Sequence, residues 1–109
     1  MALYMTQFAY TPEAWATLAK NPQDRREAVS AACSKVGGRL VSLYYCFGEY
    51  DGVVIFEAPD DVAAAAIPVS AAAAGHLKMM KTTRLLTVEE TMDAMRRAGS
   101  IEFQGLRKS

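Results

Sequence analysis

Proton transfer is the chemistry that the ionisable residues of this sequence best support, and two residues stand out. His76 is the only histidine, and an imidazole with an unperturbed pKa of about 6.5 can both donate and accept a proton near neutral pH. Asp51 closes the Gly-Glu-Tyr-Asp run at 48–51 and could act as a base or as a polar anchor. Each has a structural alternative, because Asp-Gly is a common turn and a histidine at the end of a helix interacts favourably with the helix dipole.

A second group of residues has the types expected in a ligand pocket, namely phenols and a cation. The candidates are Tyr4, Tyr44, Tyr50 and Arg84. Tyrosines of this kind are also ordinary core residues, and Tyr50 could simply cover the core beside its turn. Cations on a strand, such as Arg84 and Lys81, can equally protect a sheet edge from aggregation.

The spacing of metal-binding residue types predicts no metal site. Cys33 and Cys46 form no Cys-x-x-Cys pair, and we expect both to be small buried hydrophobes in a reducing cytoplasm. A glycine-rich phosphate loop, a Gly-x-Ser-x-Gly elbow and a His-Glu-x-x-His pair do not occur in the sequence. We therefore predict no cofactor, which leaves cofactor-free reactions as the enzyme class to consider.

The first half of the chain is predicted to form a strand followed by two short helices. Residues 2–10 alternate with the residue types of a strand. Thr11-Pro12 is typical of a helix start, and Pro22 predicts a break in that helix. We expect Asn21 to cap a second helix, which ends at Gly37-Gly38.

The second half is predicted to form a hairpin, a helix, a strand and an additional helix. Residues 39–47 and 53–58 are strands joined by a five-residue connection. An alanine-rich helix runs to residue 74, and Pro68 is expected to kink or split it. Residues 76–86 form the last strand, in which one alternating face holds His76, Lys78, Met80, Thr82 and Arg84. Thr87 and Glu90 then match a capping box for a helix that ends at Gly99.

This order of elements is that of an α+β, ferredoxin-like βαββαβ fold with a four-stranded antiparallel sheet, helices on one face and an extra C-terminal helix. We assign residues 1–98 to a single domain and 99–109 to a C-terminal tail. Both faces of the strands at 39–47 and 53–58 are apolar, so the face without helices needs a cover. A second copy of the sheet is the simplest cover, which predicts a homodimer or a higher homo-oligomer through that face.

The hairpin and its surroundings resemble a known family. The segment at 47–54, followed by Glu-Ala-Pro-Asp-Asp at 57–61, is similar to the GYD domain family, named for a Gly-x-Tyr-Asp signature. The resemblance extends from residue 4 to about residue 98, including Gly37-Gly38 and Gly75-His76. It implies the dimeric α/β barrel superfamily, whose members include cofactor-free monooxygenases, dehydratases, isomerases and effector-binding domains, so it implies no single activity.

Composition limits the partners that we expect. The 109 residues carry 12 Lys plus Arg against 12 Asp plus Glu and are 51% hydrophobic, which predicts one globular domain. Zero net charge argues against a nucleic-acid or anionic membrane partner, since both need a basic face. The preferred hypothesis is a cytoplasmic, homo-oligomeric module that binds a small molecule, and the alternative is a small cofactor-free monooxygenase, isomerase or dehydratase that uses His76 and Asp51.

Overall fold

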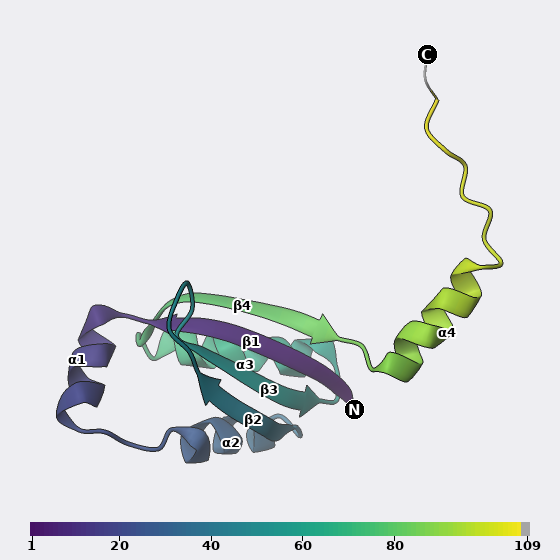
Figure 1. The fold of residues 1–109 in the computed structure, drawn as a ribbon. Coiled ribbons are helices and arrows are strands. Elements are labelled where there is room, and N and C mark those ends of the chain that lie inside the picture. Colours follow the sequence, from purple (N-terminus) through teal and green to yellow (C-terminus); the bar gives the residue numbers. More distant parts are fainter. Residues whose placement is uncertain (108–109) are drawn as a thin grey trace.

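Four strands form one antiparallel sheet in the computed structural model, which describes residues 1–107 (Figure 1). The strands are β1 (Ala2–Tyr10), β2 (Arg39–Tyr45), β3 (Gly52–Ala58) and β4 (Leu77–Leu85), and they are ordered β2-β3-β1-β4. All three pairings are antiparallel. This arrangement confirms the predicted α+β, ferredoxin-like fold.

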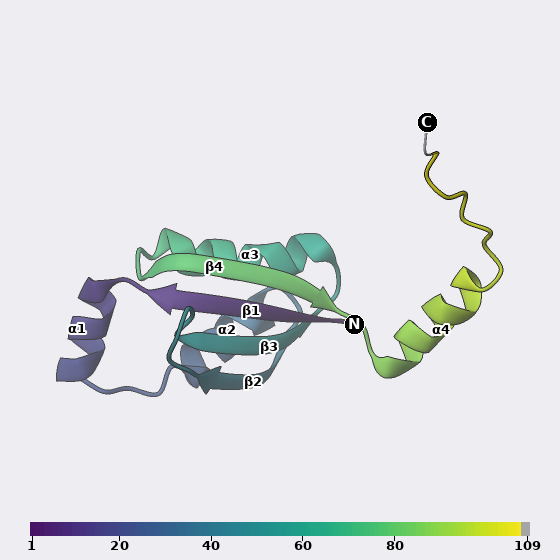
Figure 2. The ribbon, with the colours of Figure 1, turned by 45° about the horizontal axis from the view of Figure 1, so that its top comes forward.

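Three of the four helices pack against the sheet. They are α1 (Pro12–Lys20), α2 (Arg26–Lys35) and α3 (Asp61–Ala73), and each contributes a buried residue to the same core. Figure 2 shows α2 behind β2 and β3 and α3 along β4, with α1 beyond the end of β1. The fourth helix, α4 (Val88–Ala98), has no buried residue.

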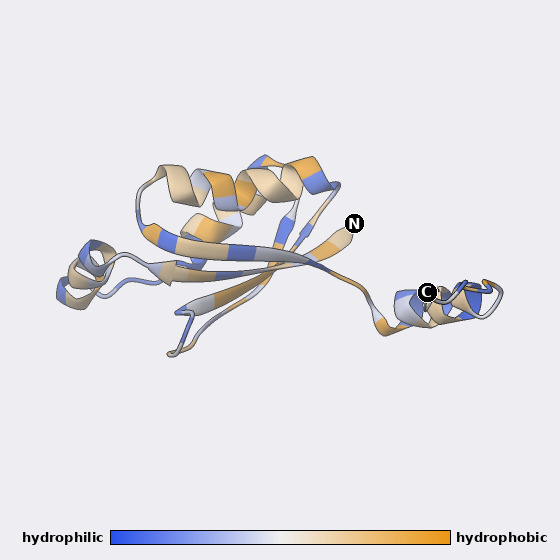
Figure 3. Cartoon of the chain, turned by 90° about the horizontal axis from the view of Figure 1, so that it is seen from above, coloured by the Kyte–Doolittle hydropathy of each residue, from blue (hydrophilic) through white to orange (hydrophobic). Residues whose placement is uncertain are grey.

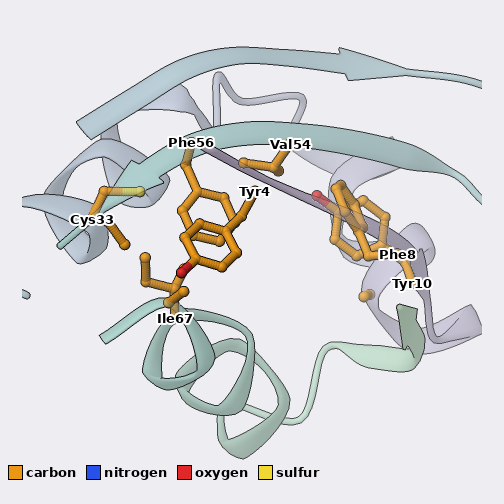
Figure 4. Close-up of a cluster of buried hydrophobic side chains, with 10 residues drawn as sticks. Tyr4, Phe8, Tyr10, Cys33, Val54, Phe56 and Ile67 are labelled. Carbon is orange, nitrogen blue, oxygen red and sulfur yellow. The ribbon is translucent and has the colours of Figure 1, made fainter. Parts of the chain in front are cut away.

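The core lies between the sheet and these three helices, because strand residues alternate between the two faces. The buried positions of β1 and β3 on this face include Tyr4, Thr6, Phe8, Val54, Phe56 and Ala58. Helices α2 and α3 supply Cys33, Ala64 and Ile67. The Tyr4 and Phe56 rings are stacked, with centroids 5.5 Å apart. Figure 4 shows them together, with Phe8 beside Tyr10 farther along the sheet. Each large apolar side chain buried in this way stabilises the fold by about 1.5–3 kcal/mol.

One predicted helix start is wrong, and one of the two predicted effects of Pro68 does not occur. Helix α2 is not capped by Asn21: it begins at Arg26, whose backbone N–H donates to Asp24 Oδ1 at 2.9 Å. Asp24 lies closer to the helix start and competes successfully for that amide. Helix α3 is continuous through Pro68, so the predicted split does not occur, although a proline has no N–H to donate to the carbonyl four residues earlier.

The predicted alternation of β4 fails at its first residues. Ala9 pairs with Met79 whereas Tyr10 pairs with Leu77, so the register shifts and Lys78 is the extra residue. Leu77, rather than His76 or Lys78, therefore packs against the core. From Met80 onward the alternation is as expected, with Thr6 and Thr82 hydroxyls 2.8 Å apart on the helix-covered face.

The opposite face of the sheet has no cover within the described residues. Figure 3 shows α2 and α3 on one side of the sheet and open space on the other. We call this surface the open face, and its central side chains are Leu3, Met5, Val53, Ile55, Thr83 and Leu85, all half-buried. Tyr44, 70% exposed, lies beside them opposite Val53.

Helix α4 extends away from the rest of the chain (Figure 1). Its apolar residues Val88, Met92 and Met95 are exposed, and residues 101–107 form neither helix nor strand. The Cα radius of gyration is 18.0 Å, compared with about 13 Å for a compact domain of this size. Within residues 1–107, no helix combines the length and the apolar character that crossing a membrane requires.

Candidate functional site

A cleft of about 320 Å³ lies between the sheet and helices α2 and α3. Its floor is formed by strand residues, which are Thr6, Phe8, Tyr10, Leu43, Tyr45, Val54 and Phe56. Its walls come from α1, the segment between α1 and α2, α2, α3 and the start of β4, with Arg25, Val29, Ile67 and His76 among them. The cleft is mostly apolar with a few polar groups, as small-molecule sites usually are.

Short side chains on the helices create this space. Five alanines line the cleft, namely Ala14, Ala28, Ala32, Ala71 and Ala74. Alanine favours helix formation, and its small side chain fills little of the space between two elements. The alanine-rich sequence of α3 therefore leaves open a space that leucines at the same positions would fill.

Aromatic residues at one end of the cleft carry hydroxyl groups. The Tyr10 and Tyr45 hydroxyls are 3.2 Å apart, and the Tyr10 ring packs edge-on against Phe8 and Trp15. Burial, followed by the hydrogen bond with Tyr45, raises the pKa of Tyr10 well above its usual value. Tyr10 is therefore a neutral phenol near pH 7 and can donate or accept a hydrogen bond there.

His76 lies at the same end of the cleft. It lines the cleft directly before β4, and its backbone carbonyl accepts the Thr11 N–H at 2.9 Å. Arg25, in the segment between α1 and α2, lines the cleft as well. The cleft thus carries an imidazole and a guanidinium, while no aspartate or glutamate is among its lining residues.

Asp51 is engaged in holding the hairpin to β1 and α1. Its Oδ2 accepts the Tyr10 backbone N–H at 2.9 Å and the Trp15 indole N–H at 3.1 Å. Its backbone N–H donates to the Phe8 carbonyl at 2.8 Å. Asp51 does not line the cleft, and no hydrogen bond joins it to His76 within residues 1–107.

Tyr4 and Arg84 lie at the other end of the sheet, outside the lining of the cleft. They face each other across β1 and β4, and the Tyr4 hydroxyl donates to Asp61 Oδ1 at the start of α3. That hydrogen bond, together with burial, raises the pKa of Tyr4, and the charge of Arg84 opposes the rise. The Tyr4–Asp61 hydrogen bond ties α3 to the sheet.

Tyr44 and Tyr50 are also outside the cleft. Tyr44 lies on the open face and Tyr50 in the hairpin connection, where its carbonyl accepts the Cys46 thiol at 3.3 Å. Cys46 is exposed, so the prediction that both cysteines are buried is wrong for it and right for Cys33. Strand β2 ends at Tyr45, which leaves Cys46 and the fully exposed Phe47 in the connection.

Of the candidate site residues, only His76 lines the cleft, and sequence reasoning missed Arg25 and Gln23. Their only sequence signal is their place in a proline-interrupted connection between two helices, a location where binding residues often occur. No group of three or more metal-ligating side chains comes together in the part of the chain that the structure describes.

The fold is that of a ferredoxin-like α+β domain with a mostly apolar cleft between its sheet and helices. The model of the GYD domain matches residues 4–95, so the chain belongs to the GYD domain family. No curated protein matches the chain.

Solved structures with a similar fold include two proteins. The 30S ribosomal protein S6 from Thermotoga maritima is 16% identical with a TM-score of 0.54, covering 90% of this chain and 97% of that one. An uncharacterized NIPSNAP domain protein from Burkholderia xenovorans is 17% identical with a TM-score of 0.44, covering 81% and 95%. The likeness to S6 supports the fold and carries no information on function.

Proposed function

We propose that this protein is a homo-oligomeric module that binds a small molecule in the cleft. The observation that carries the proposal is the cleft itself: about 320 Å³ of mostly apolar space with polar groups gathered toward one end. Its volume is at the lower end of the range for small-molecule sites, which suits a ligand of one or two rings.

Binding accounts for the arrangement better than acid–base catalysis does. A catalytic pair must reach the same reacting atoms. His76 lines the cleft, whereas the Asp51 carboxylate is outside it and already accepts two N–H groups. The cofactor-free enzyme with His76 and Asp51 as its pair therefore stays the second hypothesis.

A second copy of this chain is the proposed occupant of the open face. That face carries apolar side chains at its centre and both signs of charge around them, with the Arg39–Glu57 ion pair at 2.7 Å and Lys81 on the opposite edge strand. A surface with both signs of charge can pair with itself around a two-fold axis. A stable monomer at micromolar concentration in sedimentation velocity would contradict this part of the proposal.

The cleft is tested with a neutral fluorescent probe, N-phenyl-1-naphthylamine, whose emission increases in apolar surroundings. We expect saturable binding of one probe per chain. Ala71→Trp should abolish it, because Ala71 lines the cleft and is exposed enough to tolerate a larger side chain. Ala72→Trp is the matched control, since Ala72 is exposed on the same helix and does not line the cleft.

Two results would overturn the binding function. One is the absence of saturable binding by the wild-type protein. The other is equal binding by the Ala71→Trp and Ala72→Trp variants, which would place the probe elsewhere on the molecule.

A further inference from the structure

Arg25 differs from the other arginines of residues 1–107, because it alone is half-buried while they are exposed. No carboxylate of the described residues lies within 4.0 Å of its guanidinium. Its Nη1 donates to the neutral Gln23 side chain at 3.1 Å. Removing part of a cation's hydration without supplying a counter-charge costs free energy. An anionic partner would therefore stabilise Arg25 in this position.

The carboxylate nearest in sequence to Arg25, that of Asp24, pairs with the adjacent Arg26. Arg26 is 70% exposed in its side chain and pairs with Asp24 at 2.7 Å, and this pairing holds the pKa of Asp24 at about 2. Asp24 also accepts the Arg26 backbone N–H. Asp24, the only acidic residue between α1 and α2, therefore pairs with Arg26 and not with Arg25.

The other charged and polar groups of the cleft are compatible with an anion. His76 is the only other side chain in the lining that can carry positive charge, and none can carry a carboxylate charge. Tyr10 adds a neutral hydroxyl, and the charge of Arg25 is close enough to oppose part of the rise in its pKa. An ammonium group placed here would find hydroxyl acceptors but no carboxylate among the lining residues, and it would meet the like charge of Arg25.

The rest of the cleft is apolar. Phe8, Val54 and Phe56 form the floor, and Val29 and Ile67 face it from the helices. An aromatic or branched hydrocarbon body would bury its surface there by the hydrophobic effect. The site therefore combines one guanidinium at its margin with an apolar interior.

We propose that the ligand of the cleft is a small organic acid, with its carboxylate bound by Arg25 and its apolar body over Phe8 and Phe56. This inference rests on the proposed binding function and specifies its ligand class. A planar guanidinium binds a carboxylate through two parallel hydrogen bonds, which gives orientation as well as affinity.

Three probes that share one ring system and differ in charge test the proposal: 2-naphthoate, 2-naphthamide and 2-naphthylmethylammonium, titrated into the full chain by calorimetry. We expect naphthoate to bind at least about tenfold more tightly than naphthamide, because a charge-assisted pair outweighs a neutral hydrogen bond. The ammonium probe should bind more weakly than the amide.

Variants then assign the preference to Arg25. Arg25→Gln should reduce naphthoate affinity to that of naphthamide and leave naphthamide affinity unchanged, and Arg25→Lys should restore part of the preference. Lys20→Gln is the matched control, since it removes a nearby positive charge from an exposed side chain that does not line the cleft and leaves the Arg26–Asp24 pair intact. Circular dichroism and unfolding midpoints verify that each variant folds.

The outcomes separate the two proposals. Equal binding of all three probes, blocked by Ala71→Trp, would overturn the organic-acid inference and support the cleft as a binding site. Binding of none of them would overturn the binding function together with this inference. A naphthoate preference that survives Arg25→Gln would overturn the role of Arg25.

Discussion

Asp51 connects three parts of the fold through one side chain and its backbone. The carboxylate accepts N–H groups from β1 and α1, and the backbone N–H donates to the Phe8 carbonyl. Tyr10 is a buried residue, and its backbone N–H would lose this acceptor without the carboxylate. Asp51, which the sequence suggested as a base, thus holds the hairpin to β1 and α1.

We predict that Asp51→Ala lowers the free energy of unfolding by about 2 kcal/mol, because two N–H groups lose a charged acceptor. Asp51→Asn should cost less, since its amide oxygen can still accept. Urea unfolding followed by Trp15 fluorescence measures both effects. An Asp51→Ala variant that keeps wild-type stability and loses binding in the cleft would contradict the structural role and favour a chemical one.

Tyr10 should make stability sensitive to alkaline pH. Its pKa is raised in the folded state, so between the unfolded value of about 10 and the folded value the unfolded chain loses a proton that the folded chain keeps. Stability contributed by neutral Tyr10 is therefore complete below pH 10 and is lost as the pH rises above it. Urea midpoints at pH 9 and pH 11 measure the loss.

Tyr10→Phe should reduce this alkaline loss, because phenylalanine has no proton to release. Tyr44→Phe is the matched control, since Tyr44 is exposed on the open face. Tyr4, whose pKa is raised as well, contributes a second part of the loss. An alkaline loss identical in wild type and Tyr10→Phe would show that Tyr10 is not the group responsible.

Helix α4 has no buried residue, so its stability depends on hydrogen bonds within and at the start of the helix rather than on packing. The Thr87 hydroxyl accepts the Glu90 N–H at 3.0 Å and Glu90 Oε1 accepts the Thr87 N–H at 2.9 Å. That hydrogen bond lowers the pKa of Glu90, so its contribution is present at neutral pH and is lost as the pH falls through the folded value.

We predict that Thr87→Ala reduces the helix content of α4 and leaves the unfolding midpoint of the sheet unchanged. Losing such a cap costs about 1 kcal/mol, and an eleven-residue helix is marginal without tertiary contacts. Far-ultraviolet circular dichroism measures helix content, with Glu89→Gln as a control that spares both cap hydrogen bonds. A lower midpoint for Thr87→Ala would mean that α4 packs against another surface.

The elements also show what could be predicted from sequence. Strand and helix types followed from alternation, Pro12, the capping box and the glycine pairs, because those signals act within a few residues. The start of α2 and the extra residue Lys78 in β4 depended on side-chain competition and on pairing with β1. Neither is encoded in a short window of sequence.

The cleft was harder to predict for the same reason. It lies between α2 and α3, whose sequences are separated by two strands, so no local pattern brings Arg25 and His76 together. Alternation alone could not separate Tyr10 and Tyr45, which line the cleft, from Tyr4 and Tyr44, which do not.

At the scale of the whole molecule, the proposed homodimer depends on the open face. We predict that Ile55→Glu converts the proposed homodimer into a monomer, because Ile55 lies at the centre of that face and a buried carboxylate without a partner is costly. Sedimentation velocity at micromolar concentration is the measurement. Val62→Glu, on the exposed outer surface of α3, should leave the dimer intact, and dissociation by both variants would contradict an interface specific to the open face.

The direction of the strands places the polar end of the cleft away from residue 1 and from α4. Tyr10 ends β1 and His76 precedes β4, whereas Leu3 pairs with Leu85 at the other end of the sheet, where α4 departs. We expect an affinity tag, a fluorescent protein or a second domain joined at residue 1 or beyond α4 to lie away from the polar end of the proposed ligand site. Such fusions should let the protein be tethered, immobilised or built into a sensor with that end of the cleft open.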